Sequence, residues 1–190
     1  MQAGKSSIQF EHPPIITSAA SIVGQTEGEG PLASFFDRVE PDPTFGKKSW
    51  EEAESELQRQ TVQKCLDKAG RQAADVNCLF AGDLLGQIVA TSFGVESFDI
   101  PFFGLYGACS TMGEAMILGA MAAGAGYADR VLALASSHFA SAERQFRFPL
   151  AYGNQRPQST TWTVTGCGCV MIEENEKNEG KDGKKRKNRG

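Results

Sequence analysis

The amino-acid sequence predicts an α/β domain in which a mostly parallel sheet is covered by helices. Apolar runs typical of buried strands alternate along the chain with segments whose apolar residues recur at helical spacing. The strand-like runs are apolar on both faces, which indicates a sheet covered on both sides. Hydrophobic residues make up 41% of the 190 residues and charged residues 22%, as is normal for a globular protein that buries a core.

The first clear element is the run Ile15–Gly24, whose β-branched and small residues predict a strand. The segment Gln25–Lys48 follows as a long loop rich in Gly and Pro, and it carries Phe35, Phe36 and Phe45. A long loop that holds aromatic residues is often a cover or an interface. We therefore expect this loop to lie over another part of the molecule.

A capping box opens the first long helix. Ser49 can cap the helix, and Glu52 can reach back to the backbone of Ser49. Apolar residues then recur at steps of three and four until Gly70, which predicts one buried face and a stop at the glycine. Cys65 lies on that face, so we interpret it as part of the core.

The remaining chain continues the alternation of strands and helices. Further strands are expected at Val76–Gly82, Phe102–Ala108, Arg130–Ser137 and Thr160–Ile172. Helices are expected at Leu85–Phe93 and Ser110–Gly126, and a loop at Ser141–Arg156. The second of these helices consists almost wholly of small or apolar residues, so we expect it to be buried all round.

The composition changes at residue 173. Residues 173–190 contain seven Lys or Arg and five Asp or Glu with no apolar periodicity, so we expect a disordered tail after a domain at 1–172. The tail follows a strand directly, which indicates a truncated or shifted reading frame. The domain itself is acidic, which argues against nucleic acid as a partner.

The cysteines and the apolar stretches indicate the compartment. The five cysteines are scattered along the chain and do not form the pattern of a disulfide framework. The N-terminus lacks the apolar segment of a secretory signal. Ala115–Ala128, the longest uncharged stretch near the middle, is too short to span a bilayer. We expect a soluble protein in a reducing compartment that is not itself transmembrane.

The sharpest candidate site is Cys109, within Gly107-Ala-Cys-Ser-Thr-Met-Gly113, where a strand turns into a helix. The free N–H groups and the dipole at a helix start favour negative charge and can lower the pKa of a thiol. The same geometry can instead hold a carboxylate of a ligand. The sequence position alone leaves open a third interpretation, a buried small residue.

Two further candidates end predicted strands, where ligands bind in α/β sheets. Asp83 could orient a ligand, although a helix cap is the simpler interpretation, and Gln87 lies one turn further on. His138 could pair with a thiolate or a ligand, or it could be a structural histidine bonded to a loop.

Cys167 and Cys169 could suggest a metal, but they have no further ligands at suitable spacing. Residues two apart on a strand share a face, so we interpret them as small core positions. We expect no metal site and no cofactor.

Taken together, these segments resemble the thiolase-like superfamily. The cysteine after a strand, the small-residue helix, RVLALASS and TVTGCGCV recur in that order in ketoacyl synthases and thiolases. The resemblance is closest to the stage V sporulation protein AD family of spore-forming bacteria. It rests on AGDLLGQ, IPFFGLYGACSTMGEA, ASSHFASAERQFRFP and QRPQSTTWTVTG, and covers about residues 8–172.

The resemblance implies a layered αβαβα fold of two similar halves, of which this chain is the N-terminal half. It implies binding of dipicolinic acid, with or without calcium, for uptake into the developing spore. The ligand-binding residues would be Asp83, Gln87, Gly107, Cys109, Thr111 and His138. The implied partners are other proteins of the spore uptake channel and a second copy in a homodimer. The implied location is the cytoplasm or the periphery of the forespore or spore inner membrane.

Two alternatives stay open. The first is an acyltransferase or condensing enzyme with Cys109 as its nucleophile. In active condensing enzymes, however, the partner histidine and a further His or Asn come from the second half, so we do not expect catalysis. The second alternative is a non-functional fragment.

Overall fold

The computed structural model describes residues 1–84, 86–146, 159 and 163–175. A six-stranded sheet forms the centre, with the strand order β4-β3-β8-β7-β5-β6. Its strands are β3 (Ile15–Gly24), β4 (Arg38–Glu40), β5 (Cys78–Asp83), β6 (Phe102–Gly104), β7 (Arg130–Ser137) and β8 (Gly166–Glu173). A small separate hairpin at the N-terminus consists of β1 (Gln2–Ala3) and β2 (Ser7–Ile8).

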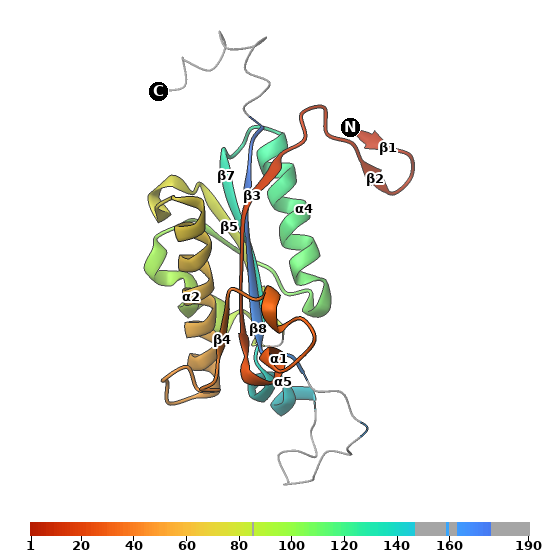
Figure 1. Cartoon of the computed structure of the whole chain (residues 1–190). Coiled ribbons are helices and arrows are strands. Elements are labelled where there is room, and N and C mark those ends of the chain that lie inside the picture. The colour runs from red at the N-terminus through yellow and green to blue at the C-terminus, as the bar shows by residue number, and fades with distance from the viewer. Residues whose placement is uncertain (85, 147–158, 160–162, 176–190) are drawn as a thin grey trace.

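Helices cover both faces of the sheet. Helix α2 (Trp50–Ala69) lies on one face with α3 (Val89–Val95) packed beside it, and α4 (Thr111–Gly124) lies on the opposite face (Figure 1). Two short helices, α1 (Gln25–Gly28) and α5 (Phe139–Phe146), lie near one end of the sheet (Figure 1). Short 3-10 turns occur at Ala33–Phe35, Ala73–Asp75, Glu96–Phe98 and Ala108–Ser110.

The sheet is mixed, but one direction dominates. Strand β8 pairs antiparallel with both β3 and β7, whereas the β3–β4, β5–β6 and β5–β7 pairs are parallel. The other five strands therefore run in the same direction, and their carboxyl ends share one edge. The predicted α/β fold with a mostly parallel, helix-covered sheet is confirmed.

Local sequence signals define several elements accurately. Strands β3 and β7 have the predicted bounds. The capping box of α2 is formed, because the N–H of Glu52 donates to Ser49 Oγ at 3.2 Å and the N–H of Ser49 donates to Glu52 Oε2 at 3.1 Å. Gly70 ends the helix in the left-handed region with a φ of 64°. Each of these signals depends on residues that are close together in the chain, so the sequence alone is sufficient to predict where these elements begin and end.

Several elements differ from the prediction, and strand β8 begins at Gly166 rather than at Thr160. The expected loop Gln25–Lys48 contains α1 and the edge strand β4, whose mostly exposed residues carry no apolar signal. The expected loop at Ser141–Arg156 begins as α5, and residues 147–156 lie outside the described part. Strand β6 is shorter than Phe102–Ala108. Helix α3 starts at Val89, because Gln87 and Ile88 have φ angles of 51° and 69°.

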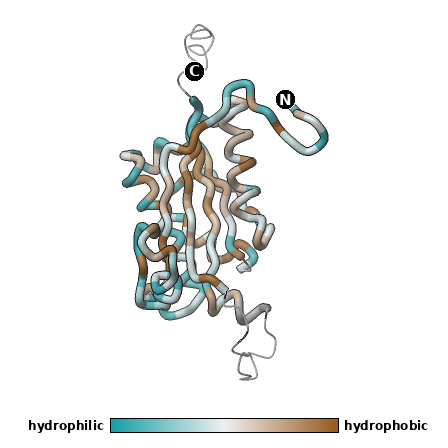
Figure 2. The backbone as a smooth tube through the Cα atoms, turned by 45° about the vertical axis from the view of Figure 1, so that its right-hand side comes forward, coloured by the Kyte–Doolittle hydropathy of each residue, from teal (hydrophilic) through white to brown (hydrophobic). Residues whose placement is uncertain are grey.

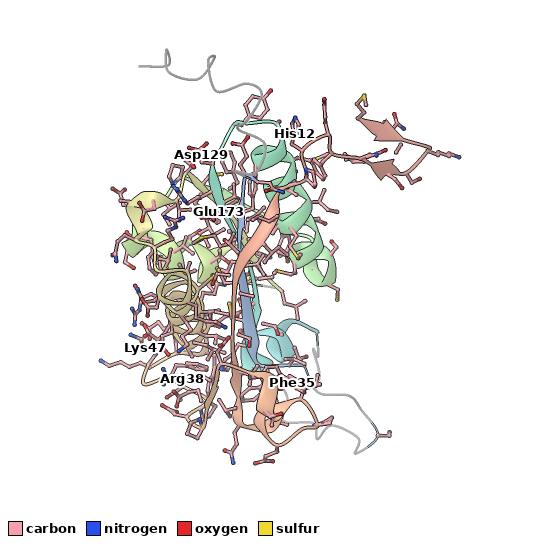
Figure 3. The ribbon with its side chains drawn as sticks, turned by 45° about the horizontal axis from the view of Figure 1, so that its top comes forward. His12, Phe35, Arg38, Lys47, Asp129 and Glu173 are labelled. Atoms are coloured by element: carbon pink, nitrogen blue, oxygen red, sulfur yellow. The ribbon has the colours of Figure 1, made fainter. Side chains whose placement is uncertain are left out.

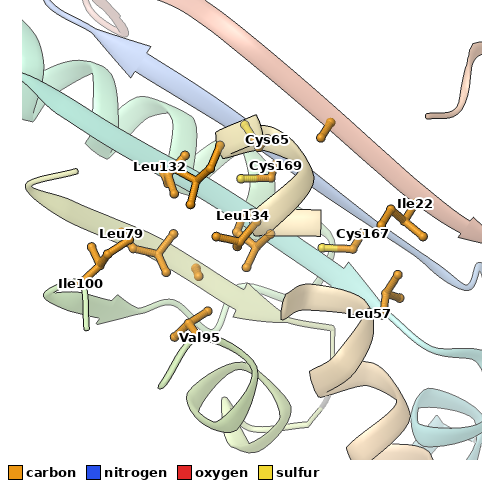
Figure 4. Close-up of a cluster of buried hydrophobic side chains, with 14 of the residues drawn as sticks. Ile22, Leu57, Cys65, Leu79, Val95, Ile100, Leu132, Leu134, Cys167 and Cys169 are labelled. Atoms are coloured by element: carbon orange, nitrogen blue, oxygen red, sulfur yellow. The ribbon is translucent and has the colours of Figure 1, made fainter. Parts of the chain in front are cut away.

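The main core lies between α2 and the sheet (Figure 4). Leu57 from α2 packs with strand residues such as Leu79, Leu132 and Leu134, all fully buried. Cys65, Cys167 and Cys169 belong to the same cluster, so their predicted role as core residues is confirmed. Figure 2 shows that the central strands carry much of the hydrophobic colour.

Helix α4 is buried on one face only. Its buried residues recur every fourth position, at Thr111, Ala115, Gly119 and Ala123. On the opposite face, Ile117, Leu118 and Met121 are 57%, 37% and 38% exposed. The prediction of a helix buried all round is therefore wrong for this chain. The sheet covers only one side of α4, and on the outer side Met116, Ile117 and Ala120 line a pocket together with Ile8 and Phe10 of the N-terminal segment.

The last described strand, β8, ends in an ion-pair cluster around Glu173. Glu173 ends β8, and its Oε1 lies 3.0 Å from Arg130 Nε and 3.5 Å from Arg71 Nε. Glu173 and Asp129 lie at the end of the sheet opposite to Phe35 and Lys47 (Figure 3). Residues 176–190 of the predicted tail lie outside the described part.

Among the described helices, none is both long enough and apolar enough to cross a membrane.

Candidate functional site at the carboxyl edge of the sheet

Three of the predicted site residues follow neighbouring parallel strands. Asp83 ends β5, Cys109 comes shortly after β6, and His138 directly follows β7. Because β7, β5 and β6 are adjacent and parallel, all three residues reach the same edge of the sheet. This edge is where ligands bind in α/β sheets.

Cys109 lies in a sharp turn that is packed against β5. The N–H of Leu105 donates to the carbonyl oxygen of Ala81 at 2.8 Å, and a Cβ at Gly82 would overlap the Leu105 carbonyl oxygen. Ala108 then has a φ of 49°, which directs the chain into the 3-10 turn Ala108–Ser110. Cys109 is exposed, whereas the other four cysteines are buried.

Gly107 and Thr111 shape the start of α4. The N–H of Gly107 donates to Thr111 Oγ1 at 3.3 Å, and Ser110 Oγ donates to the Gly107 carbonyl oxygen at 2.8 Å. Ser110 also bonds Glu114, and a Cβ at Gly107 would overlap both side chains. The opening N–H groups of a helix have no acceptor within the helix, but the Glu114 carboxylate already lies in this first turn.

Asp83 is fully buried and caps α3. Its Oδ2 accepts hydrogen bonds from the N–H of Thr91 at 3.2 Å and from Thr91 Oγ1 at 2.8 Å, and its Oδ1 accepts from the N–H of Ile88 at 3.3 Å. The geometry therefore matches the helix-cap interpretation. Gln87, by contrast, is exposed beside this cap.

His138 is fully buried, with both ring nitrogens hydrogen-bonded to backbone. Nε2 lies 2.8 Å from the Pro43 carbonyl oxygen, and the N–H of Ala140 donates to Nδ1 at 3.2 Å. Nδ1 is thus an acceptor, so the proton is on Nε2 and the ring is neutral. The ring stacks on Trp50 with centroids 5.5 Å apart, and burial lowers its pKa. This geometry matches the structural interpretation of His138.

Comparison with known proteins gives the family. A model of the stage V sporulation protein AD family matches residues 4–182. The chain is 43% identical over 169 residues to stage V sporulation protein AD of Bacillus subtilis (strain 168), covering 89% of this chain and 50% of the relative. The chain belongs to the stage V sporulation protein AD family. It spans about half the length of the curated relative it matches.

Solved structures similar to this member of the stage V sporulation protein AD family show the fold. The priming β-ketosynthase of the R1128 polyketide pathway matches with a TM-score of 0.56 at 14% identity, over 90% of this chain and 53% of that chain. The 3-oxoacyl-(acyl carrier protein) synthase III of Xanthomonas oryzae pv. oryzae matches with a TM-score of 0.58 at 14% identity, over 89% of this chain and 58% of that chain. The expected thiolase-like fold is confirmed, with this chain matching about half of each neighbour.

A buried polar cluster that was not predicted from the sequence lies behind this edge in the stage V sporulation protein AD domain. Glu54 is 1% exposed and accepts hydrogen bonds from Ser136 and Ser141. Gln58, four residues later on α2, is also fully buried. The signal was present, since both residues lie next to apolar positions on the buried face of the helix. A helical wheel with the polar residues included would have revealed them.

A pocket of about 240 Å³ opens beside His138. Pro41, Pro43 and Phe139 form apolar walls, and Glu27 contributes a carboxylate. Neither this pocket nor any other part of the described chain contains a group of three or more His, Cys, Asp or Glu arranged to hold a metal ion. The carboxyl edge of the sheet therefore offers an exposed thiol, a helix start and an apolar pocket.

Proposed function

We propose that this sporulation protein binds dipicolinic acid at the carboxyl edge of the sheet, as its calcium complex, for uptake into the developing spore. The observation that supports the proposal is the position of exposed Cys109 at the start of α4, in a chain of the stage V sporulation protein AD family. A flat ring with two carboxylates can place one carboxylate against the opening N–H groups of the helix.

The charge at the helix start favours the calcium complex over the free dicarboxylate. Glu114 lies in the first turn of α4 and would repel a bare carboxylate of the ligand. Calcium prefers oxygen ligands and can bridge two carboxylates. Cys109, Gly107 and Gln87 would contact the ligand in this arrangement, and the buried Thr111, whose hydroxyl accepts from the Gly107 N–H, would hold the turn. Asp83 and His138, whose polar atoms bond the protein itself, would hold the surrounding loops.

The same geometry supports binding over acyl transfer. In acyl transfer, a nucleophilic cysteine is commonly activated by a neighbouring base. The two ring nitrogens of His138 already bond Pro43 and Ala140, so His138 offers no free nitrogen to Cys109. The exposed thiol in a sharp turn is the observation in favour of the competing acyltransferase.

We also propose binding partners and a subcellular location for the protein. We expect the protein to act as a homodimer with other proteins of the uptake channel, in the cytoplasm or at the periphery of the forespore or spore inner membrane. The exposed apolar residues of α4 supply a surface for association.

Calorimetry on the chain with dipicolinate, with and without calcium, tests the proposal together with a thioester assay on the same sample. We expect calcium dipicolinate to bind and no thioester to turn over. Cys109→Ala should weaken binding by roughly fivefold, as expected for one lost polar contact of about 1 kcal/mol. Glu114→Gln should reduce the calcium requirement, and the exposed control Glu96→Gln should not. Absence of binding, with thioester turnover abolished by Cys109→Ala, would favour the acyltransferase.

A further inference from the structure

One buried carboxylate joins three elements of the fold. Glu54 lies on α2 and is 1% exposed. Its Oε1 accepts a hydrogen bond from Ser136 Oγ of β7, and its Oε2 accepts one from Ser141 Oγ of α5, both at 2.7 Å. None of the ion pairs among the described residues includes Glu54. Within the described part of the chain, its charge, when present, is therefore balanced by hydroxyl dipoles alone.

A chain of hydrogen bonds links Glu54 to a second buried carboxylate. Gln58 Nε2 donates to Ser136 Oγ at 2.6 Å and to Thr91 Oγ1 at 3.0 Å. Thr91 Oγ1 in turn donates to Asp83 Oδ2 at 2.8 Å. The two carboxylates are thus the two ends of one network that contains no cation among the described residues. Two negative charges in such an interior are costly, which favours a proton on one of them.

The orientation of the Gln58 amide is consistent with hydroxyls that donate toward the two carboxylates. Ser136 and Thr91 both use their hydrogens on acids, so they present lone pairs to Gln58 and require its NH₂ group. The cost is that the buried Gln58 Oε1 has no hydrogen-bond partner among the described residues. The donation of both hydroxyls toward the carboxylates thus leaves this one buried amide oxygen unsatisfied.

Ser141 can serve both protonation states of Glu54. With Glu54 ionised, Ser141 Oγ donates to its Oε2. With Glu54 protonated, the acid O–H can donate to Ser141 Oγ. The Ser141 hydrogen then turns to the His138 carbonyl oxygen, which is already only 3.1 Å away. No heavy atom needs to move, so the proton can be taken up without the loss of a hydrogen bond.

We propose that Glu54 is a proton switch that sets how firmly α5 is held against α2 and β7. In the protonated state, the neutral network holds the first turn of α5. In the ionised state, an unpaired negative charge is buried at the contact, close to Asp83. Because Phe139 at the start of α5 lines the 240 Å³ pocket, the switch acts on one wall of that pocket.

The surroundings of Glu54 place the switch near neutral pH. The pKa of Glu54 is raised to about 7, mainly by burial and to a smaller extent by the charges of Asp83 and Glu51, against the lowering effect of the Ser141 and Ser136 hydroxyls. From β8, the buried Cys167 thiol also faces Glu54, and burial keeps this thiol protonated. Helix α3 carries no charged residue, and neither do the described side chains of α5, Phe139–Ala142. His138 between β7 and α5 is neutral.

The sign of the effect follows from the two states of the chain. The pKa of Glu54 is about 7 in the folded state and has the ordinary value of 4.5 when exposed. The folded state therefore binds the proton more tightly. The stabilisation is fully present below about pH 4.5 and is lost as the pH rises to about 7.

The test is urea unfolding of the full chain between about pH 5 and pH 8, followed by the fluorescence of Trp50, which stacks on His138 and makes a tilted ring contact with Phe139. Trp162→Phe as a common background leaves Trp50 as the reporter. Glu54→Gln mimics the protonated state, and Glu56→Gln on the same helix is the matched control. Glu56 is half-buried and bonded to Arg59, which lowers its pKa to about 2.

We expect Glu54→Gln to be more stable than the parent chain at about pH 8, with the advantage gone by about pH 5. The ratio of the two unfolding constants should change by roughly tenfold to a few hundredfold, because each pH unit between the two pKa values contributes a factor of ten. Titration of His138 is common to both chains and cancels in this ratio. A ratio independent of pH, or the same change for Glu56→Gln, would overturn the proposal.

A second measurement needs no variant. Carboxyl-carbon NMR of the full chain, labelled at glutamate, should show one glutamate that titrates near neutral pH. If the Glu54→Gln variant fails to fold, this titration by itself tests whether Glu54 is the proton switch. Titration of every glutamate below about pH 5.5, near the ordinary range, would overturn the proposal.

Discussion

Asp83 and Thr91 are joined by two hydrogen bonds, one from the Thr91 N–H at 3.2 Å and one from the Thr91 hydroxyl at 2.8 Å, both to Asp83 Oδ2. The contact ties the end of β5 to the first turn of α3, and both side chains are fully buried. Asp83 therefore determines where α3 begins, and through Ile88 it also holds the loop that carries Gln87.

Replacement of Asp83 should mainly reduce stability. Asp83→Ala leaves the buried Thr91 N–H and hydroxyl without an acceptor, so we expect a loss of about 2–4 kcal/mol in the free energy of unfolding. Asp83→Asn should lose less, because its carbonyl oxygen can still accept. Urea unfolding measures both, with Asp67→Ala on the exposed side of α2 as control. A change below about 0.5 kcal/mol for Asp83→Ala would contradict the structural role.

The buried His138 should make the protein sensitive to acid. Burial lowers its pKa below the ordinary 6.5. The unfolded chain therefore binds a proton at His138 more tightly than the folded chain does. The contribution of His138 is present at neutral pH and is lost as the pH falls through the lowered pKa. Histidine NMR of the folded chain checks the pKa directly. His138→Phe should remove this acid sensitivity, and His12→Phe, at an exposed position, should keep it.

Alkylation should distinguish Cys109 from the other cysteines. Cys109 is exposed and the remaining four are buried, so iodoacetamide should modify Cys109 first in the folded chain. Peptide mass spectrometry identifies the modified site. Cys109→Ala should remove the rapid reaction, and all five thiols should react in urea. Equal labelling of all five in the folded chain would count against the site.

The outer face of α4 should drive association. Ile117 and Met121 are exposed beside Leu118, and they form an apolar surface that stays exposed although Ile8 and Phe10 line a pocket with Ile117. We expect the chain to form dimers or larger species in sedimentation experiments. Ile117→Lys with Met121→Lys should shift the chain toward monomer, whereas Leu32→Lys, at an exposed apolar position elsewhere, should not. A monodisperse monomer of the unchanged chain would rule out this prediction.

The elements that the sequence predicts well are those with local causes. The capping box of Ser49 and Glu52, the stop at Gly70 and the apolar runs of β3 and β7 act within a few residues. Helix α5 and strand β4 lack such signals. Ser141 bonds Glu54, which is distant in the chain, and β4 exists because its backbone pairs with β3.

By itself, the sequence determined the α/β class, the turn that presents Cys109 and the resemblance to the stage V sporulation protein AD family. Only the tertiary structure decided the roles of the polar residues around that turn. Hydrogen bonding and burial depend on which distant segments meet. In the folded chain, Asp83 and His138 bond other parts of the protein, and Glu54 is buried with no cation paired to it among the described residues. A side chain's chemistry can be read from the sequence, but its protonation and its partners arise from packing.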